Sequence, residues 1–181
     1  VLDTKNFTNR TGGRTFEAAA YLRRIGADTV VVRKMFSNTM DSYQRKSRIV
    51  GNAQIYRGCA VAQSDFSSDD MRVVAPQAAD ELLSIDGVDA SFVLYETGGV
   101  INISARSMGK LNVQIIMESL GGGGHLTMAG AQTKGITLEE GGRRLKQAID
   151  EYYSDLTDKD EQKALSTADA GPVQLPPPSV S

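Results

Sequence analysis

Four consecutive glycines followed by the only histidine of the chain form the most unusual stretch of this sequence: Gly121, Gly122, Gly123, Gly124 and His125. Glycine loses the most backbone entropy on folding and buries no side chain, so side-chain packing does not explain such a run. Successive backbone N–H groups bind anions, and an imidazole adds a hydrogen bond or a positive charge. The run therefore predicts a loop that binds phosphate or carboxylate; the alternative is a flexible linker with a surface histidine.

A second group of polar side chains lies in a predicted strand at residues 101–106. Asn102, Ser104 and Arg106 alternate with apolar residues, so an extended backbone places all three on one face. The planar guanidinium of arginine suits phosphate oxygens. We therefore expect Ser104 and Arg106 to form a second wall of the anion pocket, whereas an ordinary solvent-facing strand is the alternative.

Secondary structure must bring these two groups together. The apolar run 90–95 and the turn 97–99 predict a strand that forms an antiparallel hairpin with 101–106. Asn112 is a suitable N-cap for a helix that ends just before the glycines. The apolar pattern 128–131 after His125 indicates that the glycine run lies between packed elements.

Further helices follow from their spacing and end signals. Residues 18–25 have helical spacing and stop at Gly26, whereas 29–36 is too short to assign. An amphipathic stripe runs from Met71 to Ile85, but the interior Pro76 predicts that the helix proper begins near Pro76. Residues 137–140 form a capping box that opens a helix reaching 152.

Composition limits the classes of function. The chain has 40% hydrophobic and 23% charged residues and a net charge of −2, which predicts a soluble globular domain and excludes a long nucleic-acid partner. The only cysteine, Cys59, lies in an apolar stretch and is expected to be buried. No apolar run is long enough to span a bilayer. The chain begins at Val1 without an initiator methionine, from which we expect a fragment of a larger protein.

Three stretches together carry a family resemblance. Residues 101–107, 109–113 and 121–130 resemble the DHH-associated C-terminal domain of the DHH phosphoesterase family. The likeness is closest to bacterial cyclic di-AMP phosphodiesterases of the GdpP type, and it extends to about residue 153. It implies an α/β (α+β) fold, in which a central mixed β-sheet is flanked by helices and preceded by a linker helix.

The resemblance also implies roles for individual residues. Arg106 and the 121–125 loop would hold a phosphate, Ser104 would assist, and Asn112 would contact the sugar or the base. Residues 1–7 are similar to the last metal-binding motif of the family's catalytic DHH domain, with Asp3 at the matching aspartate. In enzymes of this kind that domain holds two manganese ions, which activate the water that attacks the phosphodiester.

The chain departs from the family because one histidine cannot supply the Asp-His-His motifs, and Asp3 alone cannot hold two metal ions. It is thus expected to be the substrate-binding half of an enzyme that hydrolyses cyclic di-AMP to 5'-pApA with a missing N-terminal DHH domain. The expected parts are a DHH remnant and linker (1–37), the nucleotide-binding domain (38–154) and a disordered acidic, proline-rich tail (155–181). The implied parent protein is anchored in the bacterial membrane with this domain in the cytoplasm.

Three other readings of the same residues stay open. A DHH-family oligoribonuclease or exonuclease acting on short RNA or pAp would share the anion pocket. A non-catalytic nucleotide- or RNA-binding module would need no metal. A homodimer in which 121–124 permits close contact between chains would need no ligand at all.

Overall fold

The computed structural model describes residues 4, 7, 11–37 and 39–168, with side chains up to residue 158. The chain divides into two compact units, Val1–Met40 and Asp41–Ser181, each of which is described by itself.

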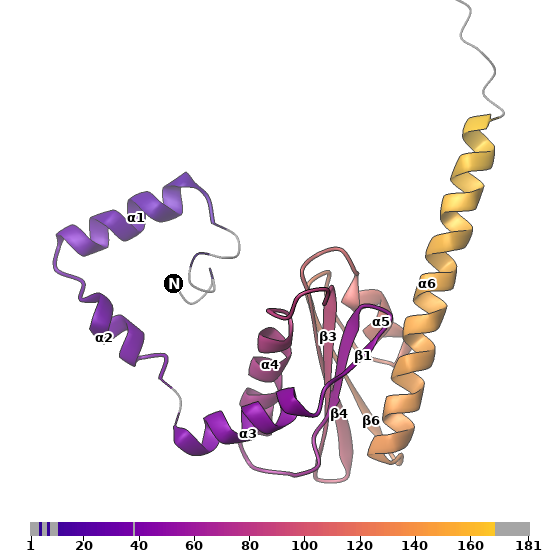
Figure 1. The fold of residues 1–181 in the computed structure, drawn as a ribbon, viewed down its shortest axis with the longest axis horizontal. Helices are drawn as coiled ribbons and strands as arrows, with labels where there is room; N and C mark the ends of the chain where they lie inside the picture. Colours follow the sequence, from indigo (N-terminus) through magenta and orange to yellow (C-terminus); the bar gives the residue numbers. More distant parts are fainter. Residues whose placement is uncertain (1–3, 5–6, 8–10, 38, 169–181) are drawn as a thin grey trace, which may run out of the picture. The chain divides into compact units, whose positions relative to one another are not determined.

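Two helices form the described part of the N-terminal unit (Figure 1). Helix α1 (Gly13–Arg24) stops as predicted, since Gly26 has a φ of +104° that favours glycine. Helix α2 (Thr29–Lys34) occupies the stretch that the sequence leaves unassigned. The Asp28 carboxylate accepts the Val30 N–H at 2.7 Å and thereby caps this short helix.

Both helices of this unit expose apolar side chains. Neither α1 nor α2 contains a buried residue. The exposed large apolar residues of the two helices are Phe16, Tyr21, Leu22, Val30 and Val31. An amphipathic helix normally buries its apolar side chains, whereas those of α1 and α2 are accessible within the described part of this unit.

The second unit is built on one six-stranded sheet with the strand order β1-β2-β3-β4-β6-β5 (Figure 1). The strands are β1 (Gln54–Tyr56), β2 (Cys59–Gln63), β3 (Ala90–Thr97), β4 (Val100–Ser107), β5 (Gly123–His125) and β6 (Met128–Lys134). Strands β2 and β3 pair in parallel, and the other neighbours pair antiparallel. This arrangement confirms the predicted mixed sheet and the predicted hairpin of β3 and β4.

Helices cover both faces of this sheet. Helices α3 (Met40–Gly51) and α4 (Met71–Leu82) contribute to one hydrophobic core, and α5 (Val113–Ser119) and α6 (Leu138–Ala168) contribute to the other. On β3, Phe92 and Leu94 point into the second core, whereas Val93 and Tyr95 point into the first. Because both of its faces are buried, β3 is apolar along nearly its whole length.

Pro76 lies inside α4, and the prediction that this helix begins near Pro76 is therefore wrong. An interior proline removes a backbone hydrogen bond and costs about 3 kcal/mol. The helix nevertheless begins at Met71, because Met71, Val74 and Ala75 are completely buried. Burial of a methionine or valine side chain contributes roughly 1.5–3 kcal/mol, so tertiary packing offsets the proline.

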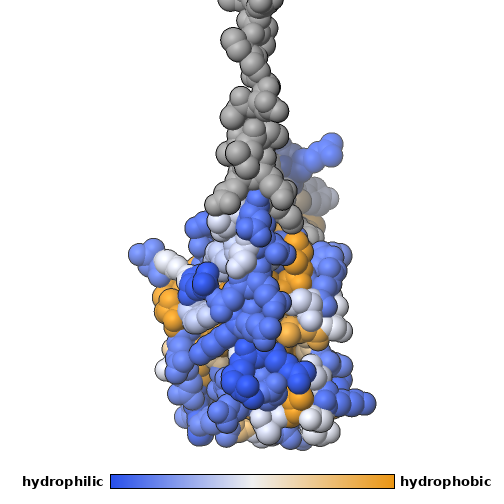
Figure 2. Space-filling model, turned by 90° about the vertical axis from the view of Figure 1, so that its right-hand side faces the viewer, coloured by the Kyte–Doolittle hydropathy of each residue, from blue (hydrophilic) through white to orange (hydrophobic). Residues whose placement is uncertain are grey.

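Helix α6 continues to Ala168, so residues 155–168 are helical where a disordered tail is predicted. This stretch contains no proline or glycine and is rich in good helix formers. Residues 169–181 of the predicted tail lie outside the described residues. Figure 2 shows that the outer side of α6 is mostly hydrophilic, as expected for a helix facing solvent. Within the described ranges, no helix combines the length and hydrophobicity needed to cross a bilayer.

Cys59 on β2 is fully buried, as predicted. Burial raises the pKa of its thiol to about 11, so at pH 8 only on the order of one thiol in a thousand is the reactive thiolate. We expect the native protein to react very slowly with a thiol reagent at pH 8, faster as the pH approaches 11, and rapidly once unfolded. Absorbance at 412 nm with Ellman's reagent measures this, and rapid native reaction at pH 8 would contradict it.

Candidate functional site

One face of the sheet carries most of the predicted anion-binding residues. On β4, Ile103 and Ala105 belong to the core beneath α5 and α6, so Ser104 and Arg106 point to the opposite face. Helix α4 packs over β3 and β4 on that face. Farther along the same face His125 is exposed, so the sheet surface over β6 and β5 is open to solvent.

Arg106 is held in place by its neighbours rather than extended into solvent. Its Nε donates to the Asp80 carboxylate of α4 at 3.1 Å, and its Nη1 donates to the Ala105 carbonyl at 2.9 Å. The residue is only 9% exposed. A guanidinium has five N–H donors, and these bonds use two of them. These two bonds fix the orientation of the guanidinium.

Strand register places Arg106 and His125 in one row across the sheet. Met128 of β6 pairs with Arg106 on one side and with His125 on the other. Neighbouring strands lie about 4.8 Å apart, so the backbones of the two residues are separated by about 10 Å. Ser104 lies in the next row on this face, opposite Gly130, which pairs with Gly123. Arg106 and His125 thus occupy the positions on either side of Met128, which is exposed.

The glycine run is not the loop predicted from the sequence. Gly121, with a φ of +78°, ends α5, and its N–H donates to the Glu118 carbonyl at 3.0 Å. The Gly122 N–H donates to the Met117 carbonyl at 2.8 Å. These two amides complete a helix C-cap and do not contribute to an anion-binding nest. Gly123 begins β5, an edge strand of the sheet.

Two of the glycines are required for backbone packing. A Cβ atom on Gly122 would overlap the carbonyl oxygen of Gly130, and one on Gly124 would overlap the backbone of Ala129. A Cβ atom on Gly123 would meet nothing within 4 Å. Packing therefore does explain part of the run, contrary to the sequence-based argument, because the backbone at Gly122 and Gly124 lies too close to β6 for a Cβ atom.

Asn112 caps α5, as its position in the sequence predicts. Its side-chain oxygen accepts the Gln114 N–H at 3.1 Å, and its own N–H donates to the Tyr152 hydroxyl at 3.0 Å. Helix α5 packs on the face opposite Ser104 and Arg106. The structure does not bring Asn112 into their row, and its contact with a sugar or base stays a prediction.

We expect Asn112→Ala to lower the free energy of unfolding by about 1 kcal/mol, because the cap is lost, and Asn112→Asp to preserve it. Urea unfolding followed by circular dichroism measures both. If Asn112→Asp were as destabilising as Asn112→Ala, capping would not be the role of this side chain.

The manganese site implied by the resemblance does not fit the residues that the structure describes. Asp3 lies outside them, and within them no group of three or more histidine, cysteine, aspartate or glutamate side chains is arranged to hold a metal ion. Two catalytic ions need several such ligands, so no metal-dependent step can be assigned to the described side chains.

Sequence reasoning missed two groups beside the predicted residues. Asp80 anchors Arg106 from 26 positions earlier in the chain. Gln132 of β6 donates to Asn102 at 2.9 Å, across a strand pair that the sequence does not specify. Only strand register and the docking of α4 reveal these pairs, although the alternation along 128–134 is a weak signal of the second.

Comparison with known proteins identifies the family of this chain. Residues 58–155 match the DHHA1 domain, more than half of the chain. The chain belongs to the DHHA1 domain family. It is 48% identical over 155 residues to the cyclic-di-AMP phosphodiesterase PdeA of Listeria monocytogenes, and 48% identical over 157 residues to the cyclic-di-AMP phosphodiesterase GdpP of Bacillus subtilis. These alignments cover 84% of this chain and 24% of each relative.

A solved structure supports the fold of this DHHA1 domain. An exopolyphosphatase-related protein from Bacteroides fragilis superposes with a TM-score of 0.74 at 25% sequence identity. The match covers 86% of this chain and 48% of that protein.

The chain spans about a quarter of the length of its phosphodiesterase relatives, which leaves most of their residues without a counterpart here.

Proposed function

We propose that this chain is the nucleotide-binding part of a cyclic di-AMP phosphodiesterase that produces 5'-pApA. One observation carries the proposal: Ser104, Arg106, Gly123 and His125 share one face of the sheet in a DHHA1 domain that is 48% identical to two cyclic-di-AMP phosphodiesterases.

The geometry supports a specific role for each group on this face. Arg106, oriented by Asp80, donates to the oxygens of a bridging phosphate. His125 and the Ser104 hydroxyl add hydrogen bonds on the same face. Met128, which is 47% exposed between Arg106 and His125, offers an apolar surface to the sugar or the base. Because these donors are held by strands, little ordering is needed when the nucleotide binds.

In this proposal the hydrolytic centre lies in a DHH domain that precedes the chain. That domain holds the two manganese ions, for which the described residues offer no site. The apolar surface of α1 and α2 fits a packing partner of this kind. We further propose that the complete protein is anchored in the membrane with this domain in the cytoplasm.

Isothermal titration calorimetry of the full chain with cyclic di-AMP, pApA, AMP and a short oligoribonucleotide tests the binding role. We expect cyclic di-AMP and pApA to bind more tightly than AMP, since each carries a second nucleotide. Tighter binding of the oligoribonucleotide than of cyclic di-AMP would favour an oligoribonuclease instead. Absence of binding by every nucleotide would overturn the proposal.

A further inference from the structure

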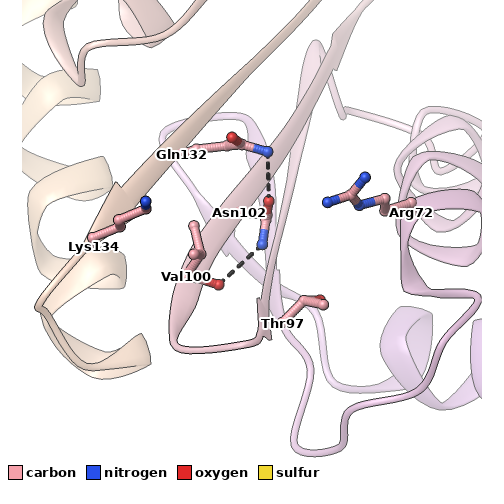
Figure 3. Close-up of a pocket in the computed structure, with 6 residues that line it drawn as sticks. All are labelled: Arg72, Thr97, Val100, Asn102, Gln132 and Lys134. Carbon is pink, nitrogen blue, oxygen red and sulfur yellow. Dashed lines mark hydrogen bonds between the residues drawn. The ribbon is translucent and has the colours of Figure 1, made fainter.

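A polar cavity lies on the same face of the sheet as Ser104 and Arg106, and neither Arg106 nor His125 lines it. It has a volume of about 280 Å³. Its lining residues are Arg72, Thr97, Val100, Asn102, Gln132 and Lys134. Figure 3 shows Arg72 reaching from α4 towards Asn102, with Gln132 and Lys134 projecting from β6 on the other side.

The two cations of this cavity differ from the other basic residues of the second unit. Within residues 41–158, Arg72 and Lys134 form no ion pair, and no acidic side chain lines the cavity. The basic residues that do pair with a carboxylate there are Arg45, Lys46, Arg48, Arg57, Arg106, Lys110, Arg143 and Arg144. Lys146 instead lies over the ring of Tyr56. Uncompensated positive charge therefore collects at this cavity.

The neutral residues of the cavity supply fixed hydrogen-bonding groups. The Asn102 amide donates to the Val100 carbonyl at 3.0 Å and accepts from Gln132 at 2.9 Å (Figure 3). Each amide nitrogen carries a second hydrogen that these bonds do not use. The Thr97 hydroxyl oxygen is buried without a hydrogen-bond partner among the described residues. Such a group is costly to leave unpaired, and a ligand oxygen would satisfy it.

We propose that this cavity is a second anion subsite, which binds a phosphate group between Arg72 and Lys134. Two cations match the double negative charge of a phosphate, and the Asn102, Gln132 and Thr97 side chains direct donors to its oxygens. The subsite stands on its own geometry and does not depend on the proposed function. Asn102 and Arg106 are four residues apart on β4, so their backbones are separated by about 13 Å. The phosphate in the subsite can therefore belong to a nucleotide that also reaches Arg106, or to a separate ligand.

The side-chain amide signals of Asn102 and Gln132 in a proton–nitrogen NMR spectrum of the full chain test this subsite. Titration with inorganic phosphate at constant ionic strength is expected to shift both signals. The double variant Arg72→Gln/Lys134→Gln should bind phosphate at least about tenfold more weakly. Both side chains are exposed, so the variant should retain a dispersed spectrum. Lys146→Gln removes a charge from α6 and should leave the shifts unchanged.

Two further arms identify the source of the phosphate. If cyclic di-AMP reaches the subsite, the double variant weakens the binding of cyclic di-AMP more than it weakens the binding of AMP. If the ligands are separate, phosphate still shifts the side-chain amide signals of Asn102 and Gln132 when cyclic di-AMP is saturating. Either result supports the subsite. Unmoved amide signals with phosphate, AMP and cyclic di-AMP, or equal phosphate affinity of wild type and double variant, would overturn it. A chain that binds phosphate here but no cyclic di-AMP would contradict only the proposed function.

Discussion

Arg106→Ala is expected to weaken the binding of cyclic di-AMP by about 10- to 100-fold while the domain stays folded. A charge-assisted hydrogen bond to an anion contributes about 1.5–3 kcal/mol, which corresponds to this range. The guanidinium is already oriented by Asp80 and the Ala105 carbonyl, so its loss removes a preorganised donor rather than a mobile one. Calorimetric titration of the full chain gives the change in Kd.

Two controls separate recognition by Arg106 from charge and from stability. Arg106→Lys keeps the positive charge but loses the planar fork, so its affinity should lie between those of the wild type and the alanine variant. Arg143→Ala removes an exposed arginine from α6, on the other side of the sheet, and should bind like the wild type. Wild-type affinity of a folded Arg106→Ala protein would remove Arg106 from the site.

Gly122→Ala should be strongly destabilising, by about 3 kcal/mol or more. The added Cβ would lie well inside 3.0 Å of the Gly130 carbonyl oxygen and of the Ala131 backbone, neither of which is the end of a flexible side chain. Overpacking against backbone forces strands apart, which typically costs 1–3 kcal/mol and sometimes more. Because β5 carries His125, we also expect nucleotide binding to weaken. Urea unfolding followed by circular dichroism measures the stability.

Gly123→Ala is the matched control for this effect. It adds the same methyl group one residue later, where nothing lies within 4 Å, so its cost should stay below about 1 kcal/mol. Gly124→Ala should resemble Gly122→Ala, because its Cβ would overlap the Ala129 backbone. Equal stability of the Gly122 and Gly123 variants would show that the glycines are not there to let β5 approach β6.

These predictions give the glycine run two roles at different positions. Gly121 and Gly122 end α5 and bring the chain back against β6. The following residues then place His125 at the edge of the open face. Any contribution of backbone amides to nucleotide binding must therefore come from Gly123 and its C-terminal neighbours.

Local patterns were sufficient to predict much of this fold. Alternation along 101–106 predicted a strand with Ser104 and Arg106 on one face, and the Asn112 cap predicted where α5 begins. Both signals depend on neighbours within a few residues, which is the range over which strand alternation and helix capping operate. The mixed sheet itself was implied by the family resemblance and is confirmed.

Only the tertiary structure decided how these elements serve the site. Packing of Met71 and Val74 overrode Pro76, and the docking of α4 placed Asp80 beside Arg106. Strand register set His125 in the row of Arg106 and closed β5 onto β6, which converted an expected loop into an edge strand. The sequence by itself determined which groups can bind an anion, because side-chain chemistry is local. Their common face depends on contacts between distant residues, which local patterns do not encode.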